Sequence, residues 1–119
     1  AIGYGTWKKR KKYDLVIVDL ISWKGKDEPG QQVNRLYTKR FLKAIKKLLV
    51  NDGIVVYQAG GGILYRLKEL LNLKRKFQDV FPKVMGYAVF VPSYHDLWAF
   101  IIARNSEKAI EIPSAYKTW

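Results

Sequence analysis

A carboxylate and an amide lie near the ends of two apolar runs, and these are the side chains best placed for chemistry. Asp19 comes near the end of Tyr13–Leu20 (YDLVIVDL), and Gln58 near the end of Gly53–Gly60 (GIVVYQAG). Open α/β sheets bind ligands outside the carboxyl ends of their strands, so both side chains could hydrogen-bond to a ligand there. Asp14, at the start of its run, belongs to the opposite edge. A turn-capping role explains Asp19 and Gln58 equally well, and the pattern leaves both roles open.

The elements that must position these residues form a strand–helix–strand unit. Tyr13–Leu20 is apolar without alternation from Leu15 to Val18, which is typical of a parallel strand buried on both faces. Leu36–Val50 (LYTKRFLKAIKKLLV) has apolar residues at helical spacing, with Thr38 as its N-cap. Together with the run that ends near Gln58, they predict a βαβ unit with a right-handed crossover.

A long loop is expected between the first strand and this helix. Ile21–Asn34 contains glycine, proline and mixed charges, and it leaves the carboxyl edge of the first strand. Long loops in compact domains are often functional. Asp27 and Glu28 are the acids of this loop, so they could either line a site or be solvated.

The second half of the chain predicts a helix followed by an antiparallel hairpin. Ile63–Phe81 is expected to be helical to about Val80 and to end at a proline. Lys83–Val91 and Leu97–Ala103 are strand-like, and a short polar turn separates them. The order βαβα plus hairpin is the second half of a doubly wound α/β sheet, a Rossmann-like arrangement. We expect one partial domain, with a basic loop (1–12), a core (13–104) and a C-terminal tail (105–119).

The composition excludes several kinds of site. The chain has 119 residues, of which 49% are hydrophobic, so a single domain with a real core is expected. It has no cysteine and one histidine, which excludes thiolate chemistry and multi-histidine metal sites, and we expect no metal. No apolar run approaches the roughly 20 residues of a membrane span, and no signal peptide is visible, so a cytoplasmic location is expected.

The net charge of +12 raises a second hypothesis. Lys8–Lys12 (KKRKK) has Trp7 and Tyr13 beside it, which offers positive charge together with stacking surfaces. A non-catalytic Rossmann-like module could bind nucleic acid or a protein partner through such basic faces. Basic residues on solvated helix faces are also ordinary, so this charge alone does not decide the function.

Three stretches, in this order, resemble the polyamine aminopropyltransferases, the spermidine synthase family. They are YDLVIVDL (13–20), LYTKRFLKAIKKLLVNDGIVVYQAG (36–60) and FPKVMGYAVFVPSYHDLWAFIIA (81–103). The resemblance covers nearly the whole chain but only the C-terminal half of the family's catalytic domain. It implies the C-terminal half of a class I methyltransferase-like sheet.

The resemblance also implies a reaction. An amine nitrogen of an acceptor such as putrescine attacks the aminopropyl carbon next to the sulfonium of decarboxylated S-adenosylmethionine, and methylthioadenosine leaves. This donor is a co-substrate, and no tightly bound cofactor is implied. Gln58 and Tyr94 match acceptor-site positions, and Asp19 matches the first acid of the catalytic-loop motif. The Tyr94 phenol can hydrogen-bond to an amine and its ring can pack on a methylene chain, although an aromatic residue in a hairpin turn needs no ligand.

The sequence departs from the family pattern at defined positions. The motif that begins at Asp19 normally continues to a second aspartate, the proposed base. Without a gap Ser22 stands there, whereas an insertion would let Asp27 or Glu28 supply the carboxylate. Tyr4 stands where the family has an aspartate that contacts adenine.

The family's donor-binding Gly-rich loop and its N-terminal domain have no counterpart in the sequence. We therefore expect that the chain alone does not catalyse, and that it works with a missing N-terminal half or as a homo-oligomer. His95-Asp96 replaces the family's Pro-Ser/Gly turn.

Overall fold

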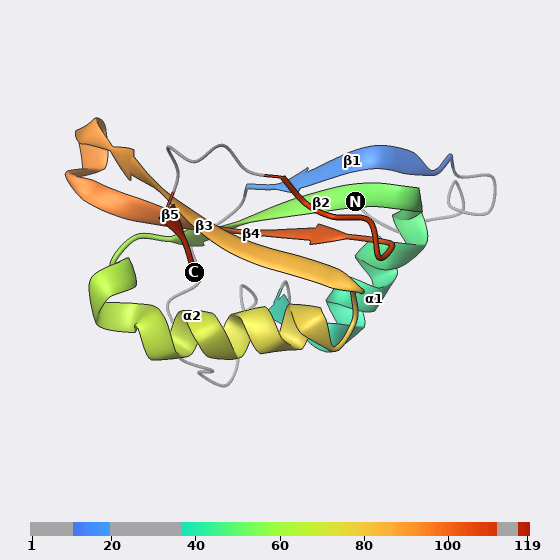
Figure 1. Ribbon diagram of the computed structural model, residues 1–119, viewed down its shortest axis with the longest axis horizontal. Helices are drawn as coiled ribbons and strands as arrows, with labels where there is room; N and C mark the ends of the chain where they lie inside the picture. The colour runs from blue at the N-terminus through green and yellow to red at the C-terminus, as the bar shows by residue number, and fades with distance from the viewer. Residues whose placement is uncertain (1–10, 20–36, 112–116) are drawn as a thin grey trace.

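A computed structural model describes residues 11–19, 37–111 and 117–119, and shows a mixed β-sheet with two helices packed on one face (Figure 1). The elements follow the predicted order βαβα plus hairpin, with one short strand added at the end of the chain. They are β1 (Tyr13–Val18), α1 (Lys39–Leu48), β2 (Leu49–Gly60), α2 (Ile63–Gln78), β3 (Lys83–Val91), the 3-10 turn η3 (Pro92–Tyr94), β4 (Asp96–Arg104) and β5 (Lys117–Thr118).

The strand order in the sheet is β1-β2-β4-β3-β5. β1 and β2 are parallel, as expected for strands joined through a helix, and β2–β4, β3–β4 and β3–β5 are antiparallel. The predicted α/β fold, with a βαβ unit and a terminal hairpin, is therefore confirmed. Only two residues separate β2 from α2, and because β1 and β2 are parallel the turn between β2 and α2 lies at the same edge of the sheet as the end of β1.

The core lies between the helices and one face of the sheet, because side chains alternate along β2 and β4. Val55, Tyr57 and Ala59 on β2 are fully buried, whereas Ile54, Val56 and Gln58 between them are half-buried. On α2 the buried stripe includes Leu70 and Phe77. The Phe77 ring meets the Tyr57 ring edge-on at 4.8 Å between centroids, which fixes the packing of α2 against β2.

α1 begins where the sequence predicts. The side-chain oxygen of Thr38 accepts a hydrogen bond from the backbone N–H of Phe41 at 3.2 Å, so Thr38 is the N-cap. The helix ends at Leu48, and β2 starts at the next residue rather than at Gly53. The helix buries Leu42 and Ile45 against the core.

β1 is not buried on both faces, and that prediction was wrong. Leu15 and Ile17 are 53% and 65% exposed, while Val18 is buried and Val16 half-buried. β1 is an edge strand, and among the described residues the core packs only on the face that carries Val16 and Val18. The apolar run is typical of a strand with covers on two sides, but among the described residues only one cover is present.

The C-terminal end packs back on the sheet through Trp119. Its indole N–H donates to the Tyr87 carbonyl at 2.9 Å, and its backbone N–H donates to the Gly86 carbonyl at 2.8 Å. The Lys74 ammonium donates to the Trp119 carbonyl at 2.8 Å and ties this end to α2.

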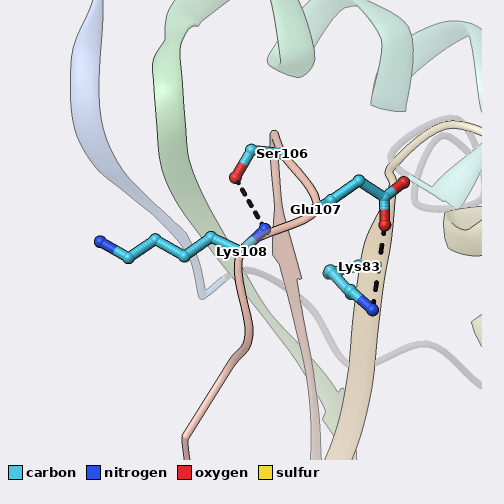
Figure 2. Close-up of polar contacts among 4 residues, drawn as sticks. All are labelled: Lys83, Ser106, Glu107 and Lys108. Atoms are coloured by element: carbon cyan, nitrogen blue, oxygen red, sulfur yellow. Dashed lines mark hydrogen bonds and ion pairs between the residues drawn. The ribbon is translucent and has the colours of Figure 1, made fainter.

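Figure 2 shows two exposed polar contacts at the far end of the hairpin. There Lys83 pairs with Glu107 at 3.8 Å, and the Lys108 N–H donates to the Ser106 hydroxyl at 3.2 Å. Exposed pairs of this kind contribute little to stability. The opposite edge, at the carboxyl ends of β1 and β2, is built differently.

Candidate functional site at the carboxyl edge of the sheet

Asp19 and Gln58 lie together at this edge. Val18 is paired with Tyr57 in the parallel ladder, so the next residue of each strand comes to the same place. The Gln58 side-chain N–H donates to an Asp19 carboxylate oxygen at 3.5 Å, a long hydrogen bond between exposed groups. The structure thus brings together two of the residues that the sequence singles out.

A buried tyrosine holds the backbone of Gln58 from the helix side. The Tyr37 hydroxyl donates to the Gln58 carbonyl at 3.0 Å, and the Tyr37 ring lies 5.8 Å from that of Tyr57. Sequence reasoning missed Tyr37. Its signal was an aromatic residue directly before the N-cap Thr38, a position whose side chain often packs back on the first turns of a helix.

Tyr94 belongs to the same edge but to the hairpin. It ends η3 and is 59% exposed, and its ring lies 4.5 Å from that of Trp98. Trp98 comes two residues before Phe100, the partner of Gln58 in the antiparallel ladder, so Trp98 and Gln58 point to the same face. Phe100 in turn stacks on Tyr87 at 5.1 Å.

These four rings, Tyr94, Trp98, Phe100 and Tyr87, form a partly exposed aromatic row that runs along the face away from the helices. Trp98 and Phe100 are both half-buried, so part of each ring faces solvent. A row of aromatic faces beside an amide and a carboxylate can bind an aliphatic chain that carries hydrogen-bonding or cationic groups.

A glycine turn, Gly60–Gly62, connects β2 to α2 beside this row. Arg66 reaches back from α2 and donates to the carbonyls of Gly61 at 2.7 Å and Ala59 at 3.4 Å. Burial lowers the pKa of the Arg66 guanidinium from its ordinary value, and the nearby Glu69 opposes that shift. Arg66 also has a non-helical backbone (φ −119°, ψ 18°), so the first turn of α2 is distorted where this side chain holds the turn.

The other residues that the sequence singles out for the site cannot be placed relative to Asp19 and Gln58. Asp27 and Glu28, like Ser22 and Tyr4, lie outside the described residues. His95 has a left-handed backbone (φ 51°) and an exposed side chain, as expected of a turn residue.

Within residues 11–19, 37–111 and 117–119, no three His, Asp or Glu side chains gather in a way that could hold a metal ion. The same part of the chain has no helix long and apolar enough to cross a membrane.

Comparison with known proteins identifies the family. The model of the spermine/spermidine synthase domain matches residues 3–113. The chain belongs to this family. It is 32% identical over 107 residues to thermospermine synthase ACAULIS5 of Arabidopsis thaliana. The alignment covers 88% of the chain and 30% of that relative. It is 33% identical, again over 107 residues, to the polyamine aminopropyltransferase of Methanocaldococcus jannaschii, with 88% and 34% covered.

Solved spermidine synthases have the same fold over most of the chain. One, in complex with the transition-state analogue AdoDATO, aligns with a TM-score of 0.59 and 22% identity, covering 85% of the chain and 31% of that structure. The enzyme from Thermotoga maritima aligns with a TM-score of 0.60 and 21% identity, covering 82% and 31%. The chain therefore spans about a third of the length of these relatives and structures.

Proposed function

We propose that the chain forms the acceptor-binding side of an aminopropyltransferase. The observation that carries the proposal is the meeting of Asp19 and Gln58 beside the Tyr94–Trp98 pair, at the carboxyl edge of the sheet, in a member of the spermine/spermidine synthase family. An acceptor amine would place its methylene chain along the aromatic rings and its nitrogen at the carboxylate.

In the proposed reaction the lone pair of the amine attacks the aminopropyl carbon of decarboxylated S-adenosylmethionine. A C–N bond forms, the C–S bond breaks, methylthioadenosine leaves, and the amine loses a proton. Asp19 would hold the amine by charge and hydrogen bonding, and Gln58 would orient the carboxylate by donating to one of its oxygens. Asp27 or Glu28 would supply the general base that takes the proton.

The proposal extends to the rest of the protein. The donor nucleoside would be a substrate bound largely by chain beyond these 119 residues, because the matched relatives are about three times as long. We infer a polyamine or diamine acceptor, a cytoplasmic location, and catalysis only together with an N-terminal half or a second copy.

Methylthioadenosine release, measured in the protein that contains this chain, tests the function with putrescine and longer amines as acceptors. Asp19→Asn should lower kcat/KM by about 100-fold or more, since it removes both a charge and a positioning contact. Asp14→Asn is the matched control, because it removes the same charge at the other end of β1, away from the site. This variant should leave turnover unchanged. Absence of turnover with every amine would refute the proposal.

A second candidate is binding of a polyanion, which one surface favours. α1 contains no acidic residue, and its exposed side presents Arg40, Lys43 and Lys47. Two other cations of this helix are already engaged, since Lys39 pairs with Asp79 at 2.7 Å and Lys46 donates to the Val80 carbonyl at 3.0 Å. Affinity for single-stranded RNA that falls steeply with salt, and that Lys43→Ala weakens, would support this function. Weak, salt-insensitive retention would exclude it.

A further inference from the structure

One carboxylate joins the two turns that flank the candidate site. An Asp96 oxygen accepts a hydrogen bond from the Gly62 N–H at 2.7 Å, and its other oxygen accepts one from the Leu97 N–H at 2.7 Å. Gly62 lies at the start of α2, and Asp96 follows the turn between β3 and β4. Both contacts are short and charge-assisted, the stronger kind of protein hydrogen bond.

The glycine turn fits tightly against this carboxylate and the aromatic row. A Cβ atom added at Gly61 would lie 2.7 Å from a Trp98 ring carbon and 2.8 Å from an Asp96 oxygen, distances that side chains essentially never show. The other neighbour of Trp98 is Tyr94, at 4.5 Å between ring centroids. The turn, the Asp96 carboxylate and the Tyr94–Trp98 pair therefore pack as one unit.

The backbone hydrogen bonds between β2 and β4 do not by themselves hold the glycine turn against the hairpin turn. β2 and β4 pair regularly from Ile54 to Gln58, but the register then shifts, and the last pair is Gly60 with Ala99. Beyond that pair, the Asp96 side chain links the two turns by its hydrogen bond from the Gly62 N–H. The distance between Gln58 on β2 and Tyr94 in the hairpin turn thus depends on this side chain as well as on the ladder.

We propose that Asp96 is a positioning residue for the acceptor amine. By fastening the glycine turn to the hairpin, it fixes the Tyr94–Trp98 pair relative to Gln58 and Asp19. This inference rests on the proposed aminopropyl transfer and deepens it, since it assigns a role to a residue that touches neither substrate.

Asp96→Asn is the sharpest test, because an asparagine has a single side-chain acceptor oxygen for two N–H donors. The KM for the acceptor amine should rise about ten-fold, which corresponds to about 1.4 kcal/mol, while the KM for the donor changes little. Gly61→Ala should give the same split, because its methyl group pushes the same contact apart from the other side. Asp14→Asn serves again as the control for the loss of charge.

Backbone amide NMR of the same variants separates this inference from the proposed function. In Asp96→Asn the Gly62 or the Leu97 amide signal should shift strongly, since one of them loses its acceptor. A rise in both KM values together, or an unchanged acceptor KM despite the lost amide contact, would overturn the positioning role. If the wild-type protein turns over no amine, the proposed function fails and the positioning role fails with it. The amide signals then still decide whether Asp96 fastens the turns, and unchanged Gly62 and Leu97 signals would refute that too.

Discussion

Tyr57 offers a test of how the core supports the site. Its hydroxyl oxygen is fully buried and has no hydrogen-bond partner among the described residues. Its ring packs against Tyr37 and Phe77, and a phenylalanine would keep both contacts. A buried polar group without a partner costs about 1–3 kcal/mol, so Tyr57→Phe should raise the free energy of unfolding by about 1 kcal/mol or more.

Tyr37→Phe is the matched control and should have the opposite sign. The Tyr37 hydroxyl donates to the Gln58 carbonyl at 3.0 Å, and its removal should lower the free energy of unfolding by about 0.5–1.5 kcal/mol. Urea denaturation at neutral pH measures both variants, with an unchanged m-value showing that the same surface unfolds. A loss of stability in Tyr57→Phe as large as that in Tyr37→Phe would mean that the Tyr57 hydroxyl is bonded, and would refute the reasoning.

Tyr57→Phe should also change how stability depends on pH in the alkaline range. Burial, with a smaller contribution from Tyr37, raises the pKa of Tyr57 far above its ordinary value. The unfolded chain releases this proton near pH 10 and the folded chain keeps it, so the free energy of unfolding falls as the pH rises. By pH 11 the wild-type protein should lose about 1.4 kcal/mol more than Tyr57→Phe does. Parallel curves for the two proteins between pH 9 and 11 would contradict the shift.

Two further predictions concern the frame of the site. Gly86→Ala should displace Trp119, because a Cβ there would lie under 3.0 Å from the indole ring, and stability should fall by about 1–3 kcal/mol. In a double-mutant cycle, Gly86→Ala should cost almost no stability when Trp119→Ala is already present, because the indole ring is then gone. If the losses of stability from the two substitutions are instead additive, the ring and the glycine do not touch. Thr38→Ala should cost about 1 kcal/mol in thermal unfolding while Thr38→Ser costs much less, because serine keeps the capping oxygen; equal losses would argue against the cap.

The sequence was sufficient for the part of the site that rests on the parallel ladder. Asp19 and Gln58 follow adjacent apolar runs, and two parallel strands bring their carboxyl ends to one edge whatever the details of the loops. Local capping chemistry was equally readable, as Thr38 shows. Both inferences depend on short-range rules that hold in nearly every α/β sheet.

The sequence could not reveal the contacts between distant turns. The Asp96 carboxylate and the Gly62 N–H are 34 residues apart, and no local pattern marks an aspartate that serves another loop. The same holds for Tyr37, whose hydroxyl reaches a carbonyl 21 residues away. Such contacts arise only when packing fixes both elements, so they become visible in the structure alone.

β1 carries more apolar side chains than the described part of the chain buries. Leu15 and Ile17 have the composition of a two-sided interior, yet they lie exposed on an edge strand. Full burial of each such side chain is worth about 1.5–3 kcal/mol, so a cover over this face would gain several kcal/mol. The matched relatives are about three times as long as this chain, which leaves ample sequence for such a cover. Asp19 lies at the end of this same strand. Whatever covers Leu15 and Ile17 would therefore also approach the candidate site, and this supports the proposal that aminopropyl transfer belongs to a larger unit than these 119 residues.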